Sequence, residues 1–335
     1  SLDADGDYIW SASWGGDVEV DAYDHGSGIV VGEFGDIYVT GNVAGENIDF
    51  DPDPDEEAYM SALDGCDAFL SKFDLSGNFE WGGLWGGYLD DYGFGVATES
   101  QGNIYVTGRF EGMVDFDPGY GAEVYISNGE GYDAYLTKFD FLGIHQWAKV
   151  WGGEDLNDYG WSVYAGGLDT IHVIGDFEGT CDFDPGPGID EHSSNGEYDI
   201  FLSSFNSAGW YNWAVTWGAE TVMDYGYGVY CDANGNAFIT GSITGDNVDF
   251  DPGEPVDARD TSNADAYNHL GFSHRKLGEY DPARTYYAKA LDIEPDHVRA
   301  LEYLGELYVE TGDMSAAEEM LTRIESVCGR GCAEY

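Results

Sequence analysis

The sequence predicts a mainly β protein with an α-helical C-terminal part. The β region is expected to be a β-propeller of four-stranded blades about 66 residues long, and the C-terminal region is expected to form two pairs of helices. Three observations predict this fold class: a unit recurs at a fixed spacing, each unit holds four strand-like runs, and the spacing of apolar residues becomes helical after Ser262. A repeat period this long is typical of propeller blades or solenoid coils.

The recurring unit has a Trp-Gly corner, a following aspartate, an alternating strand-like segment, an Asp-Phe-Asp-Pro turn and a second tryptophan. Sixty-six residues separate Trp85 from Trp151 and Trp151 from Trp217, whereas 71 separate Trp14 from Trp85. Seventeen positions separate each corner aspartate from a glycine, in the pairs Asp24 and Gly41, Asp91 and Gly108, Asp158 and Gly175, and Asp224 and Gly241.

Four runs with strand character make up the best-defined copy, at residues 94–98, 103–110, 134–140 and 144–150. They are rich in β-branched and aromatic residues, and Gly, Asn, Asp or Pro separates them, which indicates antiparallel strands joined by turns. Four strands per copy favour a propeller blade over a coil of a parallel β-helix, which would normally be shorter.

The repeat begins and ends out of phase. Residues 1–14 align without a gap on residues 72–85, which places them in the third and fourth strands of a blade. The fourth copy continues through the turn at 249–252 to residues 265–267. Half a blade, three blades and half a blade make four blade equivalents, which either close within one chain or join head to tail between molecules.

The charge is strongly negative. Sixty-five acidic against 12 basic residues give a net charge of −53. Such a field repels nucleic acid and anionic lipid and attracts cations. We therefore expect no nucleic-acid partner, and the absence of a long apolar run predicts no membrane insertion. Bound calcium, which is abundant outside cells, would relieve the repulsion.

The C-terminal region resembles tetratricopeptide repeat (TPR) proteins. Its small and apolar residues return after 34 positions, in the pairs Leu270 and Leu304, Gly271 and Gly305, Gly278 and Gly312, and Ala283 and Ala317. Small residues let paired helices approach closely, and the second glycine of each repeat ends the first helix of the pair. We expect a propeller domain at 1–257 and a helical domain at 258–335. The resemblance implies a groove that binds a protein or peptide, without catalysis.

The β region resembles the bacterial propeller repeats known as SBBP repeats, over residues 1–257. The segments that carry the resemblance are GNIYVTG, VDFDPG and the closing Trp-Gly-Gly. The resemblance implies a propeller in a secreted or cell-surface protein, and it implies no activity.

The Asp-Phe-Asp-Pro turns are the candidate metal sites. Residues two apart in an extended segment point the same way, so both carboxylates of a turn would face one point and suit calcium. The alternative is that each aspartate caps its own backbone. The candidate ligands are Asp49, Asp51, Asp115, Asp117, Asp182, Asp184, Asp249 and Asp251.

Other repeated or clustered residues have structural interpretations. The corner aspartates are expected to bond the Gly-rich corner behind them more than a metal. Tryptophans four apart in each copy are expected to pack between blades more than to bind sugars. Cys328 and Cys332 flank a short flexible span and form a disulfide or stay free thiols.

Catalysis is not expected. The acids repeat from copy to copy, and the unrepeated polar residues Arg109, His145, His172 and His192 form no recognisable triad. We expect a non-enzymatic extracellular scaffold or recognition module, a calcium-stabilised acidic propeller whose helical groove binds a protein partner. The alternative function is a self-assembling subunit of a filament or surface layer, a homopolymer joined by half-blade complementation. A carbohydrate-active enzyme is the more distant alternative.

Overall fold

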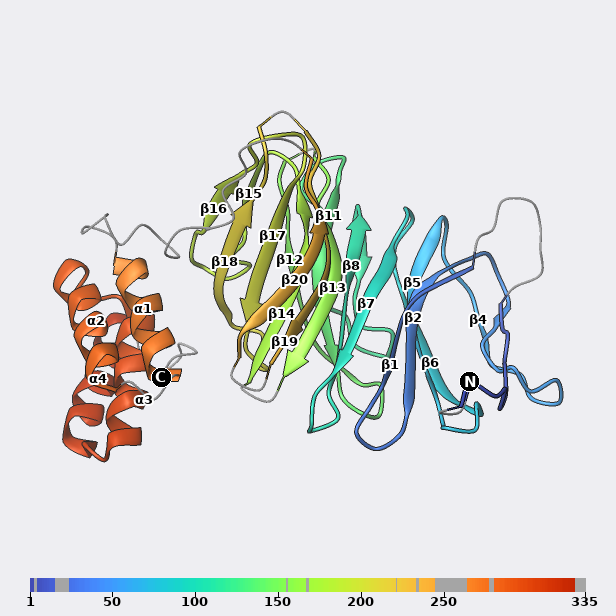
Figure 1. Cartoon of the computed structure of the whole chain (residues 1–335), viewed down its shortest axis with the longest axis horizontal. Coiled ribbons are helices and arrows are strands. Elements are labelled where there is room, and N and C mark those ends of the chain that lie inside the picture. The colour runs from blue at the N-terminus through green and yellow to red at the C-terminus, as the bar shows by residue number, and fades with distance from the viewer. Residues whose placement is uncertain are drawn as a thin grey trace. The chain divides into compact units, whose positions relative to one another are not determined.

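The computed structural model describes residues 1–2, 5–15, 24–154, 156–166, 169–220, 222–232, 235–244, 264–276 and 280–328. The chain divides into two compact units, Ser1–Phe250 and Asp251–Tyr335. The first unit holds strands and the second holds helices (Figure 1).

Three four-stranded antiparallel sheets form the first unit, one for each complete copy of the repeat. The first contains, in order, β1 (His25–Val31), β2 (Ile37–Ala44), β5 (Cys66–Phe73) and β6 (Phe79–Trp85). The second contains β7 (Tyr92–Thr98), β8 (Ile104–Glu111), β11 (Tyr132–Phe139) and β12 (His145–Trp151). The third contains β13 (Tyr159–Gly166), β14 (Thr170–Phe177), β17 (Asp199–Phe205) and β18 (Tyr211–Trp217). The four strands predicted in each copy are therefore confirmed.

A small two-stranded ribbon follows the second strand of each sheet, and the sequence analysis did not predict it. The ribbons pair β3 (Ile48–Asp49) with β4 (Tyr59–Met60), β9 (Met113–Asp115) with β10 (Val124–Ile126), and β15 (Thr180–Asp182) with β16 (Glu191–Ser193). Strands of two or three residues show no periodicity that a sequence pattern could reveal.

A bulge in each first strand explains one repeated glycine. In β7 the register shifts between Gly93 and Gly95, opposite Gly108 of β8. A Cβ atom on Gly108 would lie 1.8 Å from the carbonyl oxygen of Tyr92, so only glycine fits there. The same clash, at 1.8, 1.7 and 2.4 Å, applies to Gly41, Gly175 and Gly241.

The sheets follow one another through their first strands. Strand β1 contacts β7, β7 contacts β13, and β13 contacts β19 (Tyr225–Cys231). Figure 1 shows β1, β7 and β13 side by side in this order. Buried aromatic and aliphatic residues fill the spaces between neighbouring sheets. The architecture is a β domain of repeated sheets, and its closure into a ring stays a prediction.

The two ends of this row differ from the complete sheets. Strand β19 pairs with β20 (Ala237–Ser242), and among the described residues β20 has no second neighbour. All six residues of β20 are exposed. At the other end, the described residues before His25 form isolated bridges, Leu2 with Tyr8 and Gly15 with Asp49, in place of the aligned strands.

The segment before β1 nevertheless contacts the first sheet as a fourth strand contacts the next sheet. Trp14 packs on Phe73 at 4.8 Å between ring centroids, and Trp10 Nε1 donates to the carbonyl oxygen of Leu75 at 3.0 Å. The corresponding pairs in later copies are Trp85 on Phe139, Trp151 on Phe205, and Trp147 Nε1 to Ser207 O. The predicted alignment of residues 1–14 with a fourth strand is supported by these contacts.

The second unit is two helical hairpins. Its helices are α1 (Ala264–Lys276), α2 (Tyr280–Ile293), α3 (Val298–Thr311) and α4 (Met314–Cys328). A Cβ atom on Gly271 would lie 2.5 Å from the ring of Tyr287, which confirms the predicted close approach of α1 and α2. Gly312 ends α3 in the left-handed conformation, with φ of 82°. The two predicted helix pairs are confirmed.

Candidate functional site

The Asp-Phe-Asp-Pro turns use their carboxylates to hold the backbone. Asp115 Oδ1 accepts hydrogen bonds from the backbone N–H of Asp117 at 3.1 Å and of Glu123 at 2.8 Å. Asp117 Oδ1 in turn accepts from the N–H of Gly119 at 2.8 Å. Asp49, Asp51, Asp182 and Asp184 make the corresponding bonds in the other two described copies.

These bonds correspond to the capping role that the sequence left open beside calcium binding. Within the described part of the chain, three or more His, Cys, Asp or Glu residues do not come together in an arrangement that could hold a metal ion. Asp249 and Asp251 lie outside the described residues, as does the pair formed by the Cys328 side chain and Cys332. Calcium binding and the disulfide stay predictions.

The corner aspartates bond the corner, as predicted. Asp91 Oδ2 accepts from the N–H of Gly87 at 2.7 Å, and its Oδ1 accepts from the N–H of Glu111 at 3.2 Å. Asp158 and Asp224 make the same pair of bonds. Burial raises the pKa of Asp91 to about 8, although these two N–H groups lower it.

A second buried aspartate faces each corner, and the sequence analysis did not assign it a role. Asp133 and Asp158 both surround Gly152: a Cβ atom there would lie 2.3 Å from Asp133 Oδ1 and 2.9 Å from Asp158 Oδ2. Burial raises the pKa of Asp133 to about 7, and its Oδ1 has no hydrogen-bond partner. Asp67 and Asp199 occupy the same place beside Gly86 and Gly218. The repeated Tyr-Asp or Cys-Asp at the start of each third strand was the available signal.

The repeated tryptophans are packing residues. Trp85, Trp151 and Trp217 are 2%, 2% and 8% exposed. Trp85 packs on Phe139 and Trp151 on Phe205, each at 5.3 Å between ring centroids and each in the following sheet. The prediction that these residues pack between blades is confirmed, and they offer no open face to a sugar.

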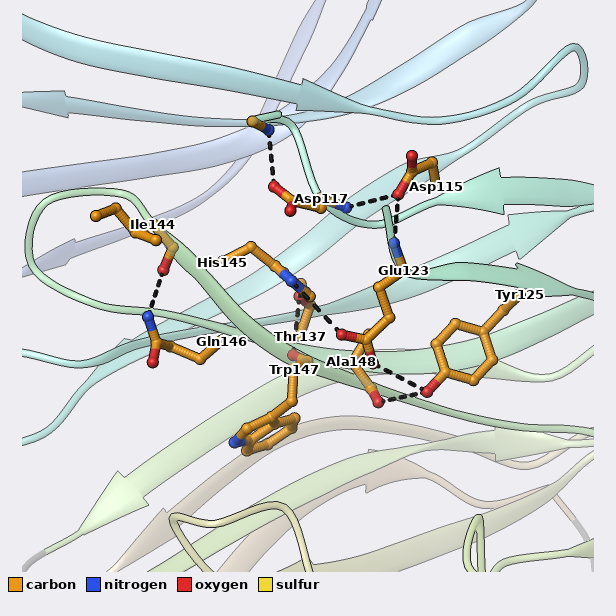
Figure 2. A network of polar contacts seen from close by, with 11 residues as sticks. Asp115, Asp117, Glu123, Tyr125, Thr137, Ile144, His145, Gln146, Trp147 and Ala148 are labelled. Carbon is orange, nitrogen blue, oxygen red and sulfur yellow. Dashed lines mark hydrogen bonds and ion pairs between the residues drawn. The ribbon is translucent and has the colours of Figure 1, made fainter. Parts of the chain in front are cut away.

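A polar network lies under the ribbon of the second sheet (Figure 2). Glu123 Oε1 accepts from the Tyr125 hydroxyl at 3.1 Å and from the Ala148 N–H at 3.1 Å, and its Oε2 lies 3.7 Å from His145 Nδ1. His145 Nε2 lies 3.1 Å from Thr137 Oγ1. Burial lowers the pKa of His145, opposed by the charge of Glu123. The network joins the ribbon to the sheet, because Glu123 and Tyr125 of the ribbon contact His145 and Ala148 of β12.

The third sheet has a similar network of a carboxylate, a tyrosine and a histidine, but the tyrosine and the histidine have exchanged positions. Asp190 accepts from the Tyr211 hydroxyl and lies 3.3 Å from His192 Nε2. Register places His192 where the second sheet has Tyr125, and Tyr211 where it has His145. In the first sheet these positions hold Ala58, Met60 and Phe79, which pack together in an apolar cluster. The three equivalent positions are therefore all polar in the second and third sheets and all apolar in the first sheet.

Of the four unrepeated polar residues, Arg109 alone lines a cavity where the first strands meet, whereas His145 and His192 lie at the ribbons and His172 packs on Trp213. A cavity of about 680 Å³ opens there, with residues of β1, β7, β13 and β19 around it. Its lining includes His25, Ser27, Asn42, Phe94, Arg109 and Trp161. These positions differ between copies: where β7 has Phe94, the other first strands have Ser27, Trp161 and Tyr227, and the equivalents of Arg109 are Asn42, Asp176 and Ser242.

Arg109 lies among aromatic rings in this central cavity. Its guanidinium carbon is 4.4 Å from the ring centroid of Tyr92, 4.1 Å from that of Tyr132 and 4.8 Å from that of Tyr159. Phe94 and Trp161 stack on each other at 4.5 Å beside it. The sequence shows that Arg109 is unrepeated, but its pattern does not predict a cavity that Arg109 shares with aromatic residues of several copies. The sequence signal that could have located the cavity is that the residues at the Phe94 and Arg109 positions differ from copy to copy.

The helical unit has a mixed surface on α1 and α3. Arg275 of α1 forms ion pairs with Glu306 at 2.5 Å and Glu310 at 3.3 Å, both on α3. Phe272 packs on Tyr303 at 5.2 Å, and Val309 of α3 is 54% exposed. This α1–α3 face combines carboxylates with apolar groups.

Comparison with known proteins supports a repeat protein. Residues 262–328 match the tetratricopeptide repeat family. The chain is 26% identical over 172 residues, 48% of its length, to an uncharacterized WD repeat-containing protein of Acanthamoeba polyphaga mimivirus. It is 34% identical over 64 residues and 36% identical over 61 residues to the uncharacterized ycf37 proteins of Guillardia theta and Pyropia yezoensis.

These matches are partial. The chain covers 12%, 36% and 34% of the lengths of the three relatives. Proteins of the tetratricopeptide repeat family are in general not catalytic and mediate protein–protein interaction, and the relatives are uncharacterised. Among the described helices, none is both long and apolar enough to cross a membrane.

Proposed function

We propose that this protein is a non-enzymatic scaffold whose helical unit binds a protein or peptide partner. The observation that carries the proposal is the pair of helical hairpins that matches the tetratricopeptide repeat family, with carboxylates and apolar groups exposed together on the α1–α3 face. A groove of this kind recognises an extended or helical peptide by a few anchors. Because Glu306 and Glu310 are partly exposed there, we expect a partner segment with basic and apolar residues.

The experiment is a selection of displayed peptides on the full chain, repeated on two variants. Val309→Lys places a charge on the α1–α3 face, and Leu321→Lys places the same charge on α4, where Leu321 is 41% exposed. We expect enriched peptides to lose at least tenfold in affinity with Val309→Lys and to bind Leu321→Lys as they bind the natural protein. Peptides that bind both variants equally well would contradict the proposed surface.

We also propose an extracellular or cell-surface setting with calcium as a stabilising ion. The resemblance to SBBP repeats and the net charge of −53 support this proposal. Uncompensated carboxylates at this density repel one another, and calcium is the common extracellular ion that neutralises them.

The second candidate function is self-assembly, which two observations favour. The segment containing Trp10 and Trp14 occupies the place of a fourth strand against the first sheet. The β19–β20 pair resembles the first half of a sheet, and β20 is exposed along its length. A second copy could complete this half-sheet and extend the row head to tail.

Light scattering at two protein concentrations distinguishes the alternatives. Assemblies that grow with concentration and shorten with Trp14→Ala would support self-assembly. A monomer at both concentrations would leave the scaffold proposal standing and remove the filament.

A further inference from the structure

We infer that the central cavity around Arg109 binds a neutral saccharide. The cavity lies in the β unit, whereas the proposed peptide surface lies in the helical unit, so the two proposals can fail separately. The inference depends on the asymmetry, the charge, the wall chemistry and the unpaired polar atom of the cavity.

The repeated copies of the β unit are alike where they hold the sheets together and differ at the cavity. Residues that hold the sheets together repeat from copy to copy, as the corner aspartates and the packing tryptophans do. Two inner positions differ between copies, that of Phe94 in the first strands, where β1 has Ser27, and that of Arg109 in the second strands, and both line one cavity. Packing of equivalent strands needs no such differences. A single asymmetric ligand at the meeting point of the copies does need them.

The second step is the charge of the ligand. The guanidinium of Arg109 already occupies the place among the aromatic rings that a ligand cation would take, because its carbon lies 4.1 to 4.8 Å from the centroids of three tyrosine rings. A ligand cation would meet this guanidinium at close range and be repelled. A ligand anion would have to approach a chain of net charge −53. An uncharged ligand avoids both penalties.

The third step is the chemistry of the walls. Phe94 and Trp161, which stack on each other, contribute aromatic surface to the cavity lining. His25, Ser27 and Asn42 add donors and acceptors to the lining, and His25 Nδ1 lies 3.1 Å from Ser27 Oγ. A ring with one apolar face and a rim of hydroxyl groups fits both kinds of lining, because each hydroxyl can donate and accept. Saccharide rings have this construction.

The cavity also has a polar side chain with an atom that lacks a partner. Arg109 Nε is buried without a hydrogen-bond partner, and among the described residues Arg109 forms no ion pair with a carboxylate. Buried polar atoms without partners are costly. The Tyr92 hydroxyl is one acceptor for the Arg109 guanidinium, and hydroxyl groups of a ligand would supply acceptors for its remaining N–H groups.

Saturation-transfer NMR on the full chain tests the inference. The probes are glucose, galactose, mannose and N-acetylglucosamine with their disaccharides, and the comparison probes are glucuronate, Nα-acetyl-lysine amide and Nα-acetyl-tyrosine amide. We expect signal from the ring protons of at least one neutral saccharide. Absence of signal from every neutral saccharide, or stronger binding of a comparison probe, would overturn the inference.

Three variants locate the site. Ser27→Trp fills the cavity from β1 and should abolish the saccharide signal, and Trp161→Ala removes the stacking surface and should weaken binding about tenfold. Tyr120→Ala, at a fully exposed residue outside the cavity, is the matched control and should bind normally. Circular dichroism and Tm establish that each variant is folded. A saccharide signal that survives in folded Ser27→Trp would place binding elsewhere and refute the site.

Discussion

At the scale of single residues, the aspartates explain why glycine stands at the Trp-Gly corner. In the second copy, Asp133 and Asp158 occupy the space that a side chain at Gly152 would need. We predict that Gly152→Ala lowers the free energy of unfolding by at least about 2 kcal/mol, because two buried side chains must move.

The control for Gly152→Ala is Gly26→Ala. A Cβ atom on Gly26 would meet one methyl group at 3.8 Å, an ordinary contact. Urea unfolding of both variants is the measurement. Equal stability of the two variants would show that the corner tolerates a side chain.

The turn aspartates allow capping and calcium binding to be separated. Asp115→Ala removes the acceptor of the Asp117 and Glu123 N–H groups and should cost about 1 to 2 kcal/mol. Asp115→Asn keeps an oxygen acceptor and should cost less. If calcium binds as predicted, millimolar calcium raises the Tm of the natural protein and raises that of Asp115→Asn by less. A Tm that responds to neither calcium nor chelator would refute calcium binding and leave capping as the role.

At the scale of elements, the polar residues under the ribbon of the second sheet can be replaced by apolar ones either singly or all together, and the two kinds of replacement should differ in cost. His145→Phe alone leaves Glu123 without its imidazole neighbour, and we predict a cost of about 1 kcal/mol. The triple variant Glu123→Ala, Tyr125→Met, His145→Phe installs the apolar set that the first sheet already uses. It should cost less than the sum of its three single variants, because Glu123, Tyr125 and His145 contact one another and are replaced together. Urea unfolding of the four variants measures this difference, and additive costs would contradict it.

The sequence predicted the strands and helices well because their patterns are local. The runs at 94–98 and 144–150 match β7 and β12 within two residues, since alternation and flanking turn residues define a strand directly. The ribbons and bulges were missed because two or three residues carry no period. The cavity was missed for a different reason. Arg109 and Trp161 lie 52 positions apart in different copies, and only the packing of β7 against β13 brings them to one place.

At the scale of the whole molecule, buried carboxyl groups predict that stability rises on mild acidification. The native pKa is about 8 for Asp91 and about 7 for Asp133, both raised by burial from 3.8. A raised carboxyl pKa means that the native state binds more protons than the unfolded state. The stability contribution is therefore fully present below about pH 4 and is lost as pH rises through 7 and 8.

A buried histidine limits this gain at lower pH. Burial lowers the pKa of His172 from 6.5 to about 4, so its contribution is present above pH 6.5 and is lost as pH falls through 4. We predict that Tm rises from pH 8 to about pH 6.5 and rises less steeply from pH 6.5 to about pH 4, where His172 opposes the two carboxyl groups. Asp133→Asn should reduce the slope above pH 6.5, because one of the titrating groups is gone. A Tm that falls between pH 8 and pH 6.5 would contradict the assignment.

The contacts of Trp14 on the first sheet have a consequence for how such a chain can change its length. Because Trp14, Trp85 and Trp151 each meet the following sheet through an equivalent phenylalanine, a 66-residue copy faces the same neighbour wherever it stands. Excision of residues 86–151 would join Trp85 to Gly152 and leave the packing between the remaining sheets intact. The number of sheets is thus a variable that whole-copy insertion or deletion can change, while the residues at the central cavity are not interchangeable between copies.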